Sequence, residues 1–385
     1  MVRSSSTGGG HDSGSAHPGR GQGQRRGRIG DDPGDLVDGS GAAGQRLASE
    51  PGVNEPPEEF VRVDEARLLG FVTECFKKSG CNHAELIARL LVNNDLRGVR
   101  SHGSASAGGY CNGFATGGFN PTPDVSVLRE TEALVVLDGD GTVGYLPMVR
   151  AAERAVAKAR EQGVGVALVR NIGHYGSSGH YTRICSEAGC IGYSVQGYRN
   201  EAVPKTPPTH AVASGNPPFS FAFPAGSELS IVVDAGAAFD SSPFVEEGFE
   251  EVARRFPSPF FKSLGMIAAS TLIGGALTGF TSAASAVVQQ RWPGANMGGT
   301  VIALDPDVIG EGDEFRAEVD RYVRDIRDGH LPLPGTQRVY LPGHLEAERM
   351  AASRREGIPF GEREQTAMRG MSGRFDLPLP WEERV

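Results

Sequence analysis

The chain has 385 residues, of which 39% are hydrophobic and 54 are glycine, and its formal net charge is −9. This length is enough for one large domain or two ordinary ones, and the negative charge disfavours extensive nucleic-acid binding. The five cysteines form no CxxC pair, which disfavours a disulfide framework or a metal site and fits a reducing cytoplasm.

Residues 1–57 consist mainly of Gly, Ser, Arg, Asp and Pro and contain almost no large apolar side chains. Such a segment cannot bury enough surface to offset its ordering entropy, so we predict a disordered tail. A cluster of Arg25, Arg26 and Arg28 leaves contact with nucleic acid or lipid open, but a solvated tail or a misassigned start codon is the simpler explanation. The tail shows no apolar core of a signal peptide.

Helices are predicted after the tail. Asp64 can cap the first of them, because apolar residues recur behind it at helical spacing. A second helix begins near Asn82 and ends before the loop 95–103, in which Ser101 and His102 are adjacent. Neighbouring side chains usually point in different directions, so this pair is not expected to act as a hydrolase dyad.

A strand is predicted over 128–138 and a helix over 147–162, and the glycines between them form a literal GxGxxG at 139–144. This is the shape of a dinucleotide fingerprint. The following strand ends in Arg170 and Asn171, however, and so lacks the acidic residue that holds a ribose and leaves only a 2′-phosphate contact open. An ordinary turn is the favoured interpretation.

The stretch 166–181 is the centre of the pattern. It predicts a buried strand, then a loop with Gly173, Gly176 and Gly179 that carries His174, then a helix. Histidine is well suited to proton transfer near neutral pH, and open α/β sheets place their sites at strand ends. The competing interpretation is a loop histidine that only bonds to backbone.

Asp234 is predicted at the end of a later strand, where a carboxylate could orient a histidine or simply belong to a turn. The apolar run 266–280 is interrupted by polar residues and is short for a membrane span, so we predict a buried helix and no membrane association. The other elements predicted from spacing are a helix at 105–114, strands at 191–195, 219–223, 229–233 and 300–304, and helices at 314–328 and 345–356.

An ordered set of short motifs resembles the type 2 malate/L-lactate dehydrogenase family, which includes ureidoglycolate and sulfolactate dehydrogenases and Δ1-piperideine-2-carboxylate reductases. The resemblance runs from about Phe60 to the C-terminus. The matching pieces are Asp95–Gly98, Ser101–Gly103, Tyr110, Asn171–Tyr181, Gly215–Pro217, Val232–Ala235, Lys262, Gly265, Leu277–Gly279, Asn296–Gly298, Ile302–Pro306, Leu341–Gly343 and Arg355–Pro359.

The resemblance implies an α/β fold that is not a Rossmann fold. A mainly antiparallel sheet, placed here at 136–319, forms the nicotinamide-cofactor domain. A helical substrate and dimerisation domain is built from both ends of the chain, at 58–135 and 320–385. Homodimers with the active site near the interface are typical of the family, so a homodimer is expected.

The resemblance also implies the roles of individual residues. His174 is similar to the acid/base that exchanges a proton with the substrate while hydride moves to or from NAD or NADP. In some members a Ser-His pair, here Ser101 and His102, works with a carboxylate that matches Asp234. The residues that match cofactor contacts are Tyr198, Asp234, Ala235, Gly236, Lys262, Glu356, Gly357 and Ile358.

Two departures from the family pattern concern the substrate. Ser106 stands where an arginine is expected to clamp a substrate carboxylate, and a serine cannot supply that charge. Arg100 stands where many members have aspartate and is a candidate replacement cation. The segment 235–262 is also shorter than usual, and Tyr198 replaces a small polar residue. We therefore expect an altered substrate.

The sequence thus predicts an NAD(P)-dependent oxidoreductase acting on a small 2-oxo or 2-hydroxy acid or a related cyclic imine. The alternative is a catalytically degenerate homologue that serves as a scaffold or partner subunit. The enzyme is favoured by retention of Ser101, His102, His174, Asp234 and Lys262, whereas Ser106 and the shortened segment favour the scaffold.

Overall fold

The computed structural model describes residues 56–198, 215–238, 249–333, 336 and 338–381. The predicted tail, apart from its last two residues, lies outside the described residues, as do residues 239–248 of the short segment 235–262 and the segment 199–214. The described residues belong to one compact unit.

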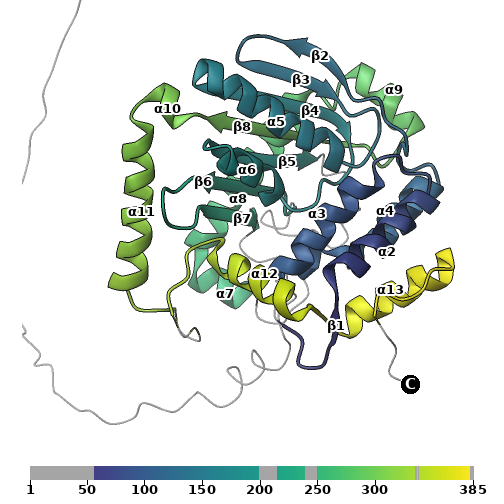
Figure 1. Cartoon of the computed structure of the whole chain (residues 1–385). Helices are drawn as coiled ribbons and strands as arrows, with labels where there is room; N and C mark the ends of the chain where they lie inside the picture. Colours follow the sequence, from purple (N-terminus) through teal and green to yellow (C-terminus); the bar gives the residue numbers. More distant parts are fainter. Residues whose placement is uncertain (1–55, 199–214, 239–248, 334–335, 337, 382–385) are drawn as a thin grey trace, which may run out of the picture. The chain divides into compact units, whose positions relative to one another are not determined.

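A mixed seven-stranded sheet forms the centre of this unit, with the strand order β2-β3-β4-β8-β5-β6-β7 (Figure 1). The pair β3 and β4 is parallel and the other five pairs are antiparallel. The prediction of an α/β fold with a mainly antiparallel sheet is therefore confirmed. The strands are β2 (Ser126–Glu130), β3 (Leu134–Asp138), β4 (Val164–Ile172), β5 (Ile191–Tyr198), β6 (Pro218–Phe223), β7 (Ile231–Gly236) and β8 (Met297–Leu304).

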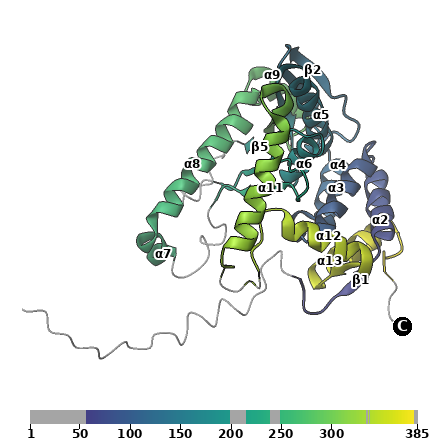
Figure 2. The ribbon, with the colours of Figure 1, turned by 60° about the vertical axis from the view of Figure 1, so that its left-hand side comes forward.

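Helices pack on both faces of the sheet. Helices α5 (Tyr145–Gln162) and α6 (Gly179–Glu187) lie on one face, and α8 (Pro257–Gly274) lies on the other, with β5 between α6 and α8 (Figure 2). Helix α5 lies close against β4, and Gly165 makes this possible, since a Cβ there would lie 1.9 Å from the Ala155 carbonyl oxygen. The core on the α5 side is built from fully buried side chains such as Val169 and Ile172.

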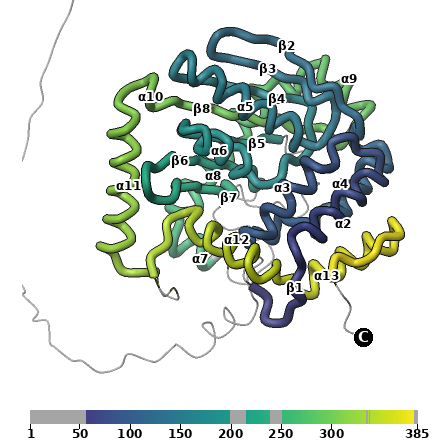
Figure 3. The backbone as a smooth tube through the Cα atoms, in the orientation of Figure 1, coloured from purple at the N-terminus to yellow at the C-terminus, as the bar shows by residue number. Residues whose placement is uncertain are grey.

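A second apolar core belongs to the helices from the two ends of the described chain. Strand β1 (Val61–Val63) pairs with β9 (Ile358–Phe360), so the purple and yellow segments meet in Figure 3. Asp64 caps α2 by accepting a hydrogen bond from Arg67 N at 3.0 Å, as predicted. The helices of this region are α2 (Glu65–Lys78), α3 (Ala84–Arg97), α4 (Ala107–Ala115), α12 (His344–Glu356) and α13 (Glu362–Phe375).

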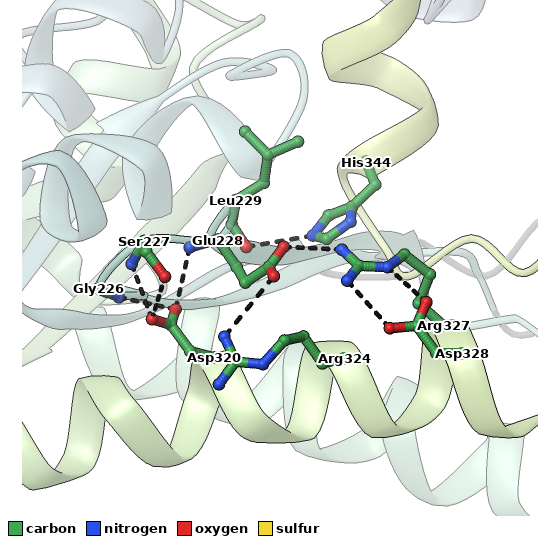
Figure 4. Close-up of polar contacts among 9 residues, drawn as sticks. All are labelled: Gly226, Ser227, Glu228, Leu229, Asp320, Arg324, Arg327, Asp328 and His344. Atoms are coloured by element: carbon green, nitrogen blue, oxygen red, sulfur yellow. Dashed lines mark hydrogen bonds and ion pairs between the residues drawn. The ribbon is translucent and has the colours of Figure 1, made fainter.

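Helix α11 (Gly312–Gly329) is attached to the loop between β6 and β7 through Asp320 (Figure 4). The Asp320 carboxylate accepts hydrogen bonds from the backbone N–H groups of Gly226, Ser227 and Glu228 at 2.8–3.0 Å. Beside it, Glu228 pairs with Arg327 at 2.8 Å. The remaining helices are α7 (Phe249–Arg255), α9 (Ala283–Arg291) and the short α10 (Pro306–Ile309).

Two predicted elements were wrong in detail. The single strand predicted over 128–138 is a hairpin, because the chain turns at Thr131, whose N–H bonds to the Leu134 carbonyl oxygen at 2.8 Å. The apolar helix predicted at 266–280 begins earlier, at Pro257, and is not buried throughout, since Phe261 is 73% and Leu272 60% exposed.

By length and composition alone, the segment Pro257–Thr278 is apolar enough to cross a membrane. This is weak evidence, because core helices of soluble proteins pass the same test. In this chain β5 contacts one side of α8, and the Ser263 hydroxyl donates to the Ala237 carbonyl oxygen at 2.9 Å. The helix is therefore part of the packed unit.

The predicted domain limits fall inside elements. A boundary at 135 cuts β3, and a boundary at 320 cuts α11. A division that follows the sheet would begin at β2 instead. The assignment of a cofactor role to the sheet and a substrate role to the helices stays a prediction.

Candidate active site

A cavity of about 590 Å³ lies where the helical region meets the sheet. Its walls come from the 3-10 turn Arg100–His102, the loop after β4, the start of α6, strands β5 to β8 and the first turn of α12. It is lined by Val99, Ser101, His102, His174, Ser177, Ser178, Arg183, Gln196, Tyr198, Asn216, Pro218, Val232, Asp234, Ala235, Gly236, Met297 and Glu346.

His174 reaches this cavity because the backbone turns sharply at the end of β4. Asn171 adopts a left-handed conformation (φ 58°) and fixes it by donating from Nδ2 to Asp138 Oδ2 at 2.7 Å. Gly176 also has positive φ (77°), and a Cβ there would lie 2.6 Å from the Tyr145 ring. The Gln196 side chain donates to the Gly173 carbonyl oxygen at 3.0 Å and holds the loop against β5.

The Nδ1 atom of His174 has two partners. The Tyr110 hydroxyl lies 2.6 Å from it, and the backbone N–H of Gly176 donates to it at 3.3 Å. Because an amide N–H can only donate, Nδ1 is the acceptor and the neutral ring carries its proton on Nε2. The Nε2–H group is thus the one that remains for a ligand in the cavity.

His102 lies beside His174, with ring centroids 5.6 Å apart, and its Nδ1 is 2.9 Å from the Ser101 hydroxyl. Burial, aided by repulsion from His102, lowers the pKa of His174 to about 4. Burial also lowers the pKa of His102, although Asp234 acts in the opposite direction. Both rings are therefore uncharged near neutral pH, and the loop histidine is more than a backbone-bonding residue.

Asp234 lies near the end of β7 and faces the first turn of α6. The Ser177 hydroxyl donates a short hydrogen bond to its Oδ2. A Cβ at Gly179 would lie 2.5 Å from the same oxygen, so only glycine allows the helix this close to the carboxylate. The predicted group of Ser101, His102, His174 and Asp234 thus lines one cavity.

Four neighbouring residues could hold a nicotinamide cofactor in this cavity. The Tyr198 hydroxyl accepts a hydrogen bond from Asn216 N at 2.9 Å, and Ala235 and Gly236 present strand backbone to the same space. A Cβ at Gly236 would lie 2.2 Å from Asn216 Oδ1, so the backbone is kept bare there. The volume falls within the usual range for small-molecule sites, and the residues fit such a group.

Other predicted site residues lie elsewhere. Lys262 is exposed on α8 and does not line the cavity. Ser106 precedes α4 and does not line it either. Arg100, Glu356 and Ile358 line a separate cavity of about 210 Å³, in which Arg100 forms an ion pair with buried Glu364. Gly357 lies between Glu356 and Ile358, and its carbonyl oxygen accepts a hydrogen bond from Arg62 Nη1 at 2.9 Å.

The sequence also left some residues of the site without a role. Tyr110, Arg183 and Glu346 belong to three different helices, and no local pattern marks them as neighbours of His174. Arg170, which left a 2′-phosphate contact open, instead pairs with Asp138 at 3.2 Å. Among the described residues, no cluster of three or more His, Cys, Asp or Glu side chains could hold a metal ion.

The model of the family described as malate/L-lactate dehydrogenase matches residues 63–241 and 245–369. A malate dehydrogenase of Pyrococcus horikoshii is 36% identical over 149 residues, which are 38% of this chain and 41% of that protein. The matched segment thus spans less than half of that relative. A solved structure of malate dehydrogenase from the same organism superposes with a TM-score of 0.71 at 22% identity, covering 84% of this chain and 98% of that one.

Two other relatives match over more of their length. An L-sulfolactate dehydrogenase of Methanocaldococcus jannaschii is 27% identical over 315 residues, covering 74% of this chain and 89% of that protein. A ureidoglycolate dehydrogenase (NAD(+)) of Escherichia coli is 25% identical over 302 residues, covering 72% of this chain and 85% of that protein.

Proposed function

This chain belongs to the malate/L-lactate dehydrogenase family, and on that premise we propose that it is an NAD(P)-dependent oxidoreductase. It transfers hydride between the nicotinamide and a small 2-oxo or 2-hydroxy acid or a related cyclic imine. The named dehydrogenases among its relatives support this class of reaction. The observation that carries the proposal is the hydrogen-bonded pair of Tyr110 and His174 in a cavity that also contains His102 and Asp234.

The proton donor in the reductive direction is the Nε2–H group of His174. It donates a hydrogen bond to the substrate oxygen or imine nitrogen and gives up its proton as that atom gains charge. The Tyr110 hydroxyl, 2.6 Å from Nδ1, replaces the lost proton on the opposite nitrogen, so the ring does not become an anion.

The acidities favour this transfer. Burial raises the pKa of Tyr110 to about 12, although its hydrogen bond with Tyr145 acts in the opposite direction. An alcohol product has a pKa close to that of water, about 15.7. Net movement of a proton from Tyr110 to the forming alkoxide is therefore downhill. In the oxidative direction the neutral ring works from its other tautomer, with its proton on Nδ1 toward Tyr110, and accepts the alcohol proton at Nε2.

Ser101, His102 and Asp234 line the same cavity and support this arrangement. The Ser101 hydroxyl fixes the orientation of the His102 ring through Nδ1. His102 in turn lies against the His174 ring and limits its movement. His102 is also the second candidate proton donor, because Asp234 stabilises its protonated form.

Tyr198, Asn216, Ala235 and Gly236 are the residues proposed to hold the cofactor, and a bound nicotinamide supplies or accepts the hydride. Between them these residues offer an aromatic ring, an amide and strand backbone. Lys262, Glu356, Gly357 and Ile358 remain proposals that rest on the family resemblance alone. We further propose a cytoplasmic homodimer, in which the sheet carries the cofactor site and the helical region carries the substrate site and the dimer contact.

The second candidate function is a degenerate homologue that acts as a scaffold. The position of Ser106 and Lys262 outside the cavity favours it, since both match family site positions. A scaffold has no need of a cofactor site, so cofactor binding separates the two functions.

The deciding experiment is a fluorescence titration of the purified protein with NADH and NADPH, using wild type, Lys262→Ala and Tyr198→Ala. Micromolar binding by wild type, weakened by Tyr198→Ala, is the expected result and selects the cofactor. An effect of Lys262→Ala would extend the site to α8. If wild type binds neither cofactor, the enzyme proposal fails and the scaffold remains.

A further inference from the structure

Arg183 is a cation in the cavity that the proposed reaction has not yet used. It lies on α6, one helical turn after Gly179, and its side chain lines the same cavity as His102 and His174. Among the residues that the structure describes around this cavity, it is the one lysine or arginine. The cavity lining therefore has a single cation, Arg183, beside two uncharged imidazoles and the carboxyl groups of Asp234 and Glu346.

The guanidinium group is held in place yet remains available. A Cβ at Gly179 would lie 2.6 Å from Arg183 Nη1 and 2.5 Å from Asp234 Oδ2, so both groups pack against the same bare backbone. Within the described part of the chain, no hydrogen bond or ion pair engages the Arg183 nitrogens. Its five N–H donors are therefore free to bind a ligand.

The electrostatic surroundings act on the charge of Arg183 in two directions. Burial lowers the pKa of Arg183, while Asp234, Glu346 and Glu187 oppose that shift. A second arginine, Arg97, is close enough that repulsion from Arg183 adds to burial in lowering its pKa to about 10. Asp234, Glu346 and Glu187 thus favour the charged form of Arg183, and a guanidinium with N–H donors to spare can still bind an anion beside them.

The cations that the sequence suggested for binding a substrate carboxylate or the cofactor lie outside this cavity. Arg100 forms its ion pair with Glu364 in the separate cavity, and Lys262 is exposed on α8. Ser106 carries no charge. Arg183 is thus the cation that shares a cavity with the proposed proton donor.

We propose that Arg183 binds the carboxylate of the substrate and so selects 2-oxo and 2-hydroxy acids over uncharged carbonyl compounds. The planar guanidinium group matches a carboxylate through two parallel N–H···O bonds. With the carboxylate fixed on α6, the neighbouring carbonyl is held on the side of the cavity where His102 and His174 lie. This inference rests on the proposed function for the identity of the substrate.

The test measures binding of an uncharged and a charged probe of similar shape. Oxalate and oxamide are titrated calorimetrically into wild type, Arg183→Met, Arg183→Lys and Arg160→Met, each with and without saturating NADH. Arg160 is the matched control, because it is an exposed arginine on α5 that lies outside the cavity. Circular dichroism confirms that each variant is folded.

We expect Arg183→Met to weaken oxalate binding by about 100-fold, the loss of two charge-assisted hydrogen bonds, and to leave oxamide and NADH binding unchanged. Arg183→Lys keeps the positive charge but cannot form two parallel hydrogen bonds, so we expect an intermediate loss of oxalate affinity. This variant also provides the test if Arg183→Met does not fold. Arg160→Met binds both probes as wild type does.

Two results would overturn the role of Arg183. One is oxalate affinity in Arg183→Met within about threefold of wild type, and the other is no oxalate binding by wild type at millimolar concentration. Neither depends on turnover. Failure of the proposed function is seen separately, as loss of NADH and NADPH binding by wild type, so the two outcomes remain distinct.

Discussion

The imidazole rings of His174 and His102 lie against each other, with centroids 5.6 Å apart and planes inclined by 24°. Two charged rings would repel each other at this distance, so the arrangement is stable only while at least one ring is neutral. The site therefore depends on its hydrogen bonds to place protons, rather than on imidazolium charge.

Replacement of His174 by alanine tests the assignment of the proton donor. We expect turnover to fall by roughly 10²–10⁴-fold, the usual contribution of general acid–base catalysis, while NADH affinity stays nearly unchanged. His102→Ala is the matched comparison. The measurement is steady-state kinetics on the best substrate. If His102→Ala lost more turnover than His174→Ala, His102 would be the proton donor and His174 the supporting residue.

The pH profile of alcohol oxidation follows from the lowered pKa of His174. The neutral ring is the form that accepts a proton, and it persists down to about pH 4. We expect kcat/KM for oxidation to hold from pH 8 to about pH 5 and to fall as the pH approaches 4. A midpoint near 6.5, the value of an exposed histidine, would contradict the buried neutral ring.

His83 lies outside the site, and its burial makes the free energy of unfolding depend on pH in the acid range. It packs edge-on to Phe114, and burial, with repulsion from Arg150, lowers its pKa from 6.5 to about 4. Between these two values the unfolded chain binds a proton that the folded chain does not, so the free energy of unfolding falls as the pH falls. Below about pH 4 this contribution no longer changes.

His83→Gln should therefore flatten the acid limb of the stability curve. Urea unfolding at several pH values would show a slope smaller than that of wild type by up to about 1.4 kcal/mol per pH unit inside this window. His102, His174 and His180 keep the same direction of dependence in both proteins. Parallel curves for wild type and variant would show that His83 takes up its proton in the folded state.

The hydrogen bonds of Asp320 hold α11 against the loop between β6 and β7, and we expect them to stabilise the folded state. Burial opposes its charge, but hydrogen bonds from Ser227, Glu228 and Gly226 outweigh burial and lower its pKa to about 2. Asp320→Ala removes the charged acceptor of three backbone N–H donors, and we expect a loss of about 1–3 kcal/mol in the free energy of chemical unfolding.

The matched control is Asp325→Ala on the same helix, whose exposed ion pair with Arg321 is worth less than about 1 kcal/mol. Because the folded-state pKa of Asp320 is depressed, its contribution is present above pH 3.8 and disappears as the pH falls toward 2. Equal losses in the two variants would refute the attachment.

The sequence was sufficient for the parts of the fold that depend on local pattern. The apolar run of β4 followed by glycines predicted the strand and the loop of His174, and Asp64 predicted the start of α2. It failed where the signal is weak. The hairpin turn at Thr131 contains no glycine, proline or asparagine, so β2 and β3 were predicted as one strand.

The polar neighbours of His174 could not be predicted in the same way. Tyr110 is 64 residues away, and Arg183 is an ordinary helical residue until the fold brings α6 beside β7. Contacts of this kind depend on the packing of whole elements, and no local spacing reports them. The family resemblance supplied the roles of His174 and Asp234, but it placed the carboxylate-binding cation at positions that do not line this cavity.

The pairing of β1 with β9 joins residues about 300 positions apart. During synthesis the ribosome releases Val61–Val63 long before their partner strand exists, so α2 and α3 must wait with part of their apolar surface uncovered. Closing so long a loop also slows folding. The helical region is thus the last part of this protein to become complete, and its completion is the stage at which a chaperone has most apolar surface to protect.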